Sequence, residues 1–283
     1  MTDLAAASRI NGRAPALLRA GIVASLVFLL LGFVSIVWTP YPVTAVDVGS
    51  AMQDPGGAHW LGTDPLGRDV LSLAMKGTLT SFVVSAVAVA IGVLIGIPLG
   101  LAAGFWGRAA NIALTGVGAY LTALPTLVVA ILFAALFGPS AATLMVAVGI
   151  GNIAAFTLVT RDAMRTAGSH GYVEAARLAG SSGLDLIRRH TLPSIMRAVL
   201  AQAVSALALG VLAEATLSYV GIGTQPPASS LGLMLRDAQS YALMKPALML
   251  VPGLAILLIV LALNITSRGV RALEPAAGSN GAA

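Results

Sequence analysis

LTSFVVSAVAVAIGVLIGIPLGLAAGF, residues 79–105, carries no charged side chain over 27 consecutive positions. A transmembrane helix needs about 20 predominantly apolar residues, because a helix rises 1.5 Å per residue and the hydrocarbon core is about 30 Å thick. The stretch is long enough to cross a bilayer as a single helix. It therefore predicts that the chain is embedded in a membrane.

The composition of the whole chain indicates the same class. Of the 283 residues, 58% are hydrophobic and 10% are charged, whereas about 25% of the residues in soluble domains are charged. Six apolar runs are long enough to form transmembrane helices, and they span residues 20–38, 79–105, 112–137, 141–160, 195–220 and 246–265. We therefore expect an all-α integral membrane protein with six transmembrane helices.

The lysines and arginines predict the orientation of these helices. If the N-terminus is cytoplasmic, 12 basic residues fall on the cytoplasmic side and 4 on the external side, and the external ones are Arg68, Lys76, Arg236 and Lys245. This excess satisfies the positive-inside rule, so both termini are predicted to be cytoplasmic. The net charge of +5 is therefore a topology signal, and no basic face interleaved with aromatic residues indicates binding to nucleic acid.

The topology divides the chain into segments with different expected roles. The first apolar run is longer than the 7–15-residue core of a secretory signal, so we expect a retained helix. The predicted segments are a cytoplasmic N-terminal segment (1–19), the first transmembrane helix (20–38), an external loop (39–78), a core domain (79–271) with the other five helices and a cytoplasmic loop (161–194), and a flexible C-terminal tail (272–283).

Small residues and prolines mark special positions in the apolar runs. Gly92, Gly96, Gly100 and Gly104 recur every fourth residue, which places them on one helix face where another helix can approach closely. That face packs either within the chain or at a subunit interface or pore wall. Pro98 and Pro125 cannot donate to the helix ladder, so each predicts a bend, with a gating hinge as the alternative. The chain has no cysteine, which excludes disulfides and thiol chemistry.

Two loops on the predicted external side contain turn residues. In HWLGTDPLGRDVLS (59–72), Gly62, Pro65 and Gly67 predict turns, and Arg68 and Asp69 begin an amphipathic stretch. GIGTQPP (221–227) predicts a rigid turn. The following LGLMLRDAQSYAL (231–243) is expected to lie flat on the membrane surface with its charged residues toward water.

The segment YVEAARLAGSSGLDLIRRHTLP (172–193) sets many charges beside small residues in the most basic predicted loop. Glu174 and Arg177 are three residues apart and can pair on a short helix that Gly180 ends. Ser182 and Asp185 have the spacing of a capping box, which predicts the start of a second short helix. Pro193 suits the first turn of the next transmembrane helix. A loop with snorkelling arginines is the alternative.

This segment resembles the EAA loop in the membrane subunits of bacterial ATP-binding-cassette (ABC) importers. The matching residues are Glu174, Ala175, Ala176, Gly180, Leu192 and Pro193, and the ending Arg189–His190–x–Leu192–Pro193 is similar to the dipeptide and oligopeptide branch. The segments GTDPLGRDVLS, AEATLSYVGIGTQPP and PGLAILLIVLALN also resemble the C-type permease subunits of that branch. The resemblance covers residues 59–271 and implies the type I importer permease fold with cytoplasmic coupling helices.

The resemblance also implies a function and a set of partners. The loop would dock into an ATPase subunit through Glu174, Ala175, Ala176, Arg177, Gly180, Asp185, Arg188, Arg189, His190, Leu192 and Pro193. The expected partners are a B-type permease subunit, one or two ATPase subunits or one fused ATPase, an extracytoplasmic substrate-binding protein and membrane lipid. The expected cargo is a di- or oligopeptide or a related small substrate, and the expected location is the bacterial inner membrane.

Two sets of residues receive expected roles within such a complex. This chain has no G-x-x-x-x-G-K-[S/T], so we expect no cofactor on it and place ATP and Mg²⁺ on the ATPase subunits. Contacts at the external loops are assigned to Gly62, Asp64, Gly67, Arg68, Asp69, Gln225, Pro226 and Pro227.

Glu214 is the acidic residue that lies well inside a predicted transmembrane helix. An unpaired buried carboxylate is costly, so Glu214 is expected to face a partner or water. It is either a pathway or gate residue or a paired or protonated carboxyl near the external helix end. The three histidines fall in loops without metal-ligand spacing, so no metal site is expected.

Two other classes of membrane protein remain as alternatives. An ion-coupled secondary transporter, working without an ATPase, would need several ionisable groups in its helices and usually an internal repeat. A membrane-embedded enzyme would need a catalytic cluster, yet neither H-E-x-x-H nor G-x-S-x-G occurs. We therefore predict a chain that is not itself an enzyme.

Overall fold

The computed structural model describes residues 2–105, 111–114, 116, 118, 125–168 and 192–272. Side chains are described from residue 16 onward, except those of residues 105, 167, 168, 193 and 194. Apart from the segments 38–69 and 221–230, these residues are mostly helical, with a single isolated bridge between Thr63 and Asp69 in place of strands. The helices are α1 (Thr2–Val37), η1 (Val48–Ser50), α2 (Val70–Ile91), η2 (Gly92–Gly96), α3 (Ile97–Phe105), α5 (Thr126–Phe137), α6 (Ala141–Gly168), α9 (Leu192–Val220), α10 (Leu231–Ala238), η4 (Gln239–Tyr241) and α11 (Ala247–Ala272). The predicted all-α class is confirmed.

Five helical stretches in the described residues are long and apolar enough to cross a membrane. They are Ala16–Val37, Val70–Gly104, Ala141–Thr166, Ile195–Val220 and Ala247–Ala272. The remaining predicted helix, 112–137, is represented by helical residues at 111–114, 116 and 118 and by α5, which has 12 residues and is too short to span alone. Pro125 is the N-cap of α5, so it begins a helix where the sequence predicted a bend within one. The count of six helices is therefore not confirmed.

The second transmembrane helix begins nine residues earlier than its apolar run. Asp69 is the N-cap of α2, and its carboxylate accepts hydrogen bonds from the backbone N–H of Ser72 at 2.8 Å and from the Ser72 hydroxyl at 2.7 Å. A capped N-terminus satisfies backbone donors that have no partner within the helix. Residues 70–78, which were predicted to belong to a loop, consequently form the first turns of α2.

A π-helical segment interrupts this helix just before its proline. The segment is η2, and Pro98 is the second residue of the helix that follows it. Proline has no N–H and its ring clashes with the carbonyl four residues earlier, so a regular α-helix cannot continue through it unchanged. A π turn widens the backbone locally and is a usual way to accommodate such a defect.

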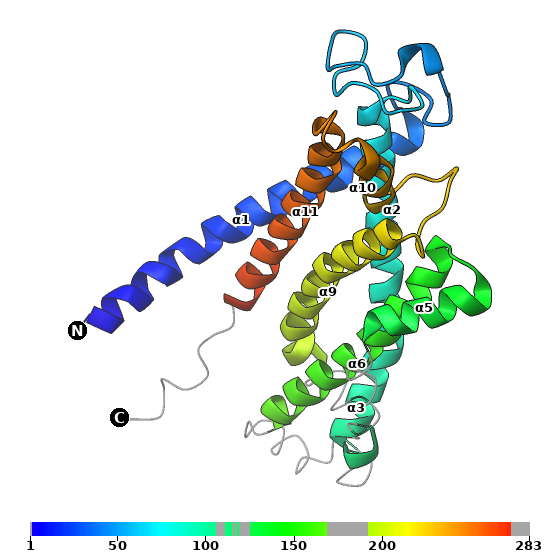
Figure 1. Cartoon of the computed structure of the whole chain (residues 1–283). Coiled ribbons are helices and arrows are strands. Elements are labelled where there is room, and N and C mark those ends of the chain that lie inside the picture. The colour runs from blue at the N-terminus through cyan, green and yellow to red at the C-terminus, as the bar shows by residue number, and fades with distance from the viewer. Residues whose placement is uncertain are drawn as a thin grey trace.

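The helices pack as a bundle in which α9 lies between α11 and the α2–α3 helix (Figure 1). One side of the bundle is closed by α1, which packs against α11 and α2, and the other by α6 with α5 on its far side. Small residues allow the α1–α11 contact: an added Cβ at Gly21 would lie 2.7 Å from the Thr266 backbone N, and one at Gly269 would lie 2.6 Å from the Leu18 side chain. The main apolar core forms where α2, α9, α10 and α11 meet, around Phe82, Val211 and Ile259.

The four regularly spaced glycines pack against α6, and we call this contact the glycine seam. An added Cβ at Gly92, Gly96 or Gly100 would lie 2.6 Å from an atom of α6, and one at Gly104 would lie 2.8 Å away. The α6 residues concerned are Asn152, Ile153, Thr157 and Met164. Of the two interpretations of this face, packing within the chain is confirmed.

Segment 38–69 and α10 lie together at one end of the bundle, which we call the α10 end (Figure 1). The buried face of α10 consists of Leu231, Gly232, Leu233 and Ala238, and it packs on α2, α9 and α11. Arg236 and Asp237 of the same helix are exposed, as the sequence predicts. The α10 end is thus a packed part of the fold.

Candidate functional site

Most of the predicted ATPase-docking segment lies outside the described residues. This applies to Glu174, Ala175, Ala176, Arg177, Gly180, Asp185, Arg188, Arg189 and His190. Leu192 and Pro193 are the first two residues of α9. The flanking ends of α6 and α9 lie away from the α10 end (Figure 1), so the segment is attached to the opposite end of the bundle.

At the α10 end, Asp64 organises the turn that the sequence predicts. One carboxylate oxygen accepts the backbone N–H groups of Leu66 at 2.9 Å and Arg68 at 2.8 Å, and the other accepts Nε–H of Arg68 at 2.6 Å. Gly67 has a φ of +74°, and a Cβ there would overlap the Asp47 carbonyl oxygen at 1.8 Å. Gly62 has a φ of +75°. Both glycines therefore sit at positions that side chains would not tolerate.

Asp69 is a buried residue that holds its neighbours in place. Besides capping α2, its carboxylate lies 3.0 Å from Nδ1 of His59, whose ring contacts the Tyr41 ring at a centroid distance of 4.4 Å. His59 is thus packed into the loop. Among the described residues there is no group of three or more potential metal ligands.

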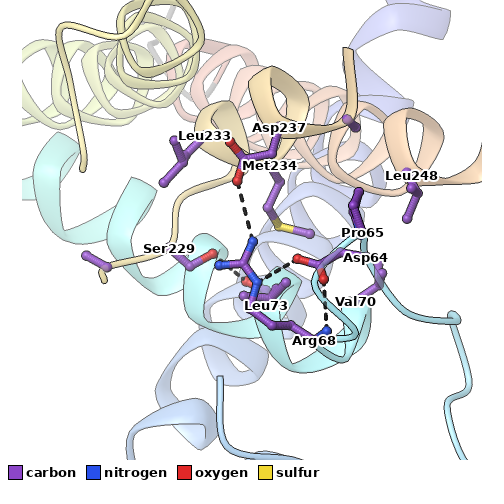
Figure 2. A pocket seen from close by; sticks show the side chains of 12 residues that line it. Asp64, Pro65, Arg68, Val70, Leu73, Ser229, Leu233, Met234, Asp237 and Leu248 are labelled. Carbon is purple, nitrogen blue, oxygen red and sulfur yellow. Dashed lines mark hydrogen bonds and ion pairs between the residues drawn. The ribbon is translucent and has the colours of Figure 1, made fainter. Parts of the chain in front are cut away.

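Arg68 connects this loop to α10. Its Nη2 lies 3.5 Å from Oδ2 of Asp237 at the edge of a small pocket of about 30 Å³ (Figure 2). Partial burial of the Asp237 carboxyl raises its pKa, and the nearby Arg68 only partly offsets this effect. The two residues are 169 positions apart, so no local pattern in the sequence could reveal the pair.

The predicted rigid turn between α9 and α10 contains a cis peptide bond between Pro226 and Pro227. Both prolines are exposed, whereas Gln225 is partly buried and its Nε2 donates to the carbonyls of Gly221 and Gly223 at 3.0 Å each. The prolines are therefore available at the surface of the α10 end, while Gln225 stabilises the turn.

Glu214 is completely buried and joins three segments of the chain. Ser81 of α2 donates its hydroxyl to one carboxylate oxygen at 2.6 Å, and the other oxygen accepts the hydroxyls of Ser218 at 2.7 Å and Thr224 at 3.2 Å. The structure thus supplies the partners that a buried carboxyl needs. We call this cluster the Glu214 clasp.

A second feature, which the sequence did not predict, is a hollow of about 520 Å³ between α5, α6 and α9. Polar side chains occur at four positions on its wall, namely Thr126, Asn152, Gln202 and Thr216. Glu214 does not line it, although its neighbours Ala213 and Thr216 do. No contiguous pattern could have revealed the hollow, because each helix contributes only one face.

Comparisons with known proteins agree with this architecture. The family model described as "Binding-protein-dependent transport system inner membrane component" matches residues 96–275. Among similar proteins, the glutathione transport system permease protein GsiD of Pectobacterium atrosepticum is 34% identical over 259 residues, covering 89% of this chain and 86% of that protein. The dipeptide transport system permease protein DppC of Alkalihalophilus pseudofirmus is 29% identical, covering 90% and 84%.

A solved structure supports the fold. The MetNI methionine ABC transporter in an inward-facing conformation matches with a TM-score of 0.58 at 19% sequence identity, covering 72% of this chain and 97% of the matched chain. At this identity the match concerns the fold alone, and that fold is the one expected from the EAA segment. By its sequence and its fold, this multi-pass membrane protein belongs to the family of binding-protein-dependent transport system inner membrane components.

Proposed function

We propose that the chain is the C-type permease subunit of an ABC importer and forms half of the path through which di- or oligopeptides, or related small molecules, cross the membrane. The observation that carries this proposal is the family match over residues 96–275, which includes α6, α9 and the segment between them. Similar proteins are named for glutathione, dipeptide and D,D-dipeptide transport, which supports a peptide-like cargo.

The other parts of the importer are proposed to lie on separate chains. A B-type permease completes the path, a substrate-binding protein delivers cargo outside the cell, and one or two ATPase subunits, or one fused ATPase, bind ATP and Mg²⁺. We place both termini in the cytoplasm of a bacterial cell, with the α10 end facing outward. This orientation rests on the excess of basic residues at the opposite end.

Segment 161–194 is proposed to transmit the motion of the ATPase to the helices. Glu174, Gly180 and the basic residues up to His190 would dock on the ATPase, and closure of the ATPase pair would switch the two permeases between inward-facing and outward-facing states. This segment begins in the last turns of α6 and ends in the first turn of α9, so a movement of the segment would act directly on two helices long enough to span the membrane, which supports the proposal.

Co-purification and coupled ATPase activity test this function. A tagged chain expressed with its partners should retain a second permease and ATPase subunits. Glu174→Lys and Gly180→Trp should each reduce cargo-stimulated ATP hydrolysis at least roughly tenfold while membrane insertion is preserved. Asp54→Lys is the matched charge control, because this residue is 81% exposed at the α10 end.

Two results would contradict the proposal. Full stimulation of ATP hydrolysis in both docking variants would remove the role assigned to segment 161–194. Uptake by the isolated chain in the absence of ATP, driven by an ion gradient, would instead support the ion-coupled transporter.

A further inference from the structure

A cavity lined by apolar side chains lies beside α1. We call it the apolar crevice, a space of about 350 Å³ between α1, α2, α9 and α11. The one polar side chain on its described wall is Ser25, whose hydroxyl lies 3.5 Å from that of Thr266. All the lining residues belong to helical stretches long enough to cross a membrane. The occupant of the crevice is therefore apolar, because a buried polar group would find almost no partner there.

Two close contacts of α1 lie on either side of the middle of the crevice. An added Cβ at Gly32 would lie 3.2 Å from the Leu79 backbone of α2, and one at Gly21 would lie 2.7 Å from the Thr266 backbone of α11. From its contact with α2, helix α1 leads away toward the N-terminus (Figure 1). A flexible chain can therefore reach the crevice from the N-terminal side of Gly32.

The volume of the crevice limits what can occupy it. An α-helix with its side chains is about 10 Å across, so a single turn of 5.4 Å already takes up about 420 Å³. The crevice, at about 350 Å³, does not hold even one turn of a helix from another subunit. An acyl chain is much thinner than a helix, and lipid surrounds every transmembrane helix. The size and the lining of the crevice thus favour an acyl chain.

The face of α1 that lines the crevice carries a cation closer to the N-terminus. Arg19, Leu26 and Phe33 are spaced by seven residues, which turn an α-helix by about 700°, only about 20° less than two full turns. Leu26 and Phe33 line the crevice, so Arg19 lies close to the same face. Leu29, in the middle of the lining, is about 15 Å from Arg19 along the axis, which equals the hydrocarbon depth of one leaflet.

Other arginines lie at the same end of the bundle. Leu18 packs on Gly269 of α11, so Arg19 and Arg268 are at the same level of the two helices. Among the described residues, the ends of α1, α9 and α11 at 16–25, 195–203 and 262–272 include no acidic side chain. Four exposed arginines there form no ion pair within the described part of the chain, namely Arg19, Arg197, Arg268 and Arg271.

We propose that the apolar crevice binds an acyl chain of an anionic phospholipid whose phosphate group is held by Arg19 and Arg268. Guanidinium groups bind phosphate oxygens through paired, charge-assisted hydrogen bonds, and basic pockets between transmembrane helices are typical sites for anionic headgroups. In the orientation proposed above, this lipid belongs to the cytoplasmic leaflet. The site is independent of the cargo, and it fills the space that α1 leaves beside α2.

The first experiment locates the acyl chain. The complete transporter is placed in nanodiscs with a phosphatidylglycerol that carries a diazirine on an acyl chain, and labelled peptides are identified by mass spectrometry after irradiation. Label should concentrate on residues 25–33 and 79–86. Ala86 is exposed and lines the crevice, so Ala86→Trp should fill it and reduce this label at least about fivefold. Val87→Trp is the matched control, because Val87 is exposed on the same helix and lines none of the three described cavities.

The second experiment tests the headgroup. A phosphatidylcholine with the same diazirine chain has no net charge, so at equal amounts it should label the crevice at least about fivefold less than phosphatidylglycerol. The double variant Arg19→Gln with Arg268→Gln should lose this preference. Arg236→Gln removes an exposed arginine at the α10 end and should keep it. All three positions are exposed, so the substitutions leave the packed core unchanged.

The outcomes separate the possible occupants. Equal labelling of the wild type by the two lipids would overturn the anionic headgroup. Label on other helices with none on residues 25–33 and 79–86 would mean that protein covers the crevice, and it would overturn the lipid site. Co-purified partners and peptide uptake are measured in the same preparations. Their loss in the wild type contradicts the proposed function, whereas uptake without label in the crevice contradicts the lipid site alone.

Discussion

The two faces of α6 show opposite uses of glycine. On the face toward the α2–α3 helix, glycines of the seam bring backbones so close that an added Cβ would lie 2.6 Å from an atom of α6. On the other face, Gly151 leaves open space in front of it, with the nearest atom at 3.8 Å. Glycine therefore permits close helix packing on one side of α6 and leaves open space on the other. The difference depends on whether a neighbouring helix packs against that side.

The two sides of helix α9 also differ, in this case in how their polar side chains are paired. On its side toward α2, the Glu214 clasp pairs both carboxylate oxygens with hydroxyls. On its other side, Gln202 and Thr216 line the hollow. The side of α9 toward α2 is thus closed by hydrogen bonds within the chain, while its other side borders an open space.

The largest effect is expected from a large residue in the seam. Gly96→Leu would bring its Cβ to 2.6 Å from the Ile153 carbonyl oxygen, so η2 and the following α3 could no longer lie as closely on α6. We expect a loss of about 3 kcal/mol or more in stability, at the upper end for overpacked cores. The measurement is the monodisperse yield and melting temperature in detergent, with Gly253→Leu as control. An unchanged melting temperature would show that the seam is not close-packed.

The Glu214 clasp should produce the next largest effect. Glu214→Leu leaves the hydroxyls of Ser81, Ser218 and Thr224 without their acceptor, which should lower the stability by about 2–3 kcal/mol. Glu214→Gln retains one acceptor oxygen and should cost about 1 kcal/mol. Thermal unfolding checks both values. Normal transport by folded Glu214→Gln protein would count against a pathway or gate role, whereas lost transport at full stability would favour one.

A smaller effect is expected at the α10 end. Arg68→Met removes the bonds to Asp64 and Asp237 from a side chain that is 19% exposed, and it should cost about 1–2 kcal/mol. The control is Lys245→Met, because Lys245 pairs with the highly exposed Asp54 and such pairs contribute about 0–1 kcal/mol. Equal losses of melting temperature in the two variants would mean that burial does not strengthen the Arg68 pairs.

The smallest effect concerns the pH dependence of stability. Burial raises the pKa of Asp237 in the folded state, so the folded protein binds the proton more tightly than the unfolded chain. The stability that this group contributes is present below its unfolded value of 3.8 and is lost as the pH rises through the folded pKa. Its carboxyl is 44% exposed, so the change should be below about 0.5 kcal/mol. Melting temperatures above pH 3.8 should decline more in the wild type than in Asp237→Asn, and parallel curves would contradict this.

The sequence predicted the features that depend on local composition. Long apolar runs identify α1, α2, α6, α9 and α11, because the length needed to cross a membrane can be counted directly. Counting apolar residues misplaces the start of α2, since Asp69 caps the helix outside the run. The predicted helix 112–137 also continues across Pro125, although Pro125 is the N-cap of α5 and the helix begins after it.

The features that sequence reasoning missed join distant residues. The hollow collects one face each from α5, α6 and α9, and the Arg68–Asp237 pair spans 169 positions. The hydroxyl partners of Glu214 include Ser81, 133 positions away. Turn residues such as Gly62 and Gly67 were identified correctly because their backbone requirement is local. The ATPase contacts of Glu174 and Gly180 stay predictions, since these residues lie outside the described part of the chain.

The π-helical segment η2 affects the direction in which the four seam glycines point around the helix axis. Residues of an α-helix are about 100° apart around the axis, so a spacing of four residues overshoots a full turn by about 40°, and three such steps from Gly92 to Gly104 would accumulate about 120°. One π turn accommodates an extra residue and so takes up about 100° of this angle. The residual rotation is about 20°, which is why all four glycines still face α6.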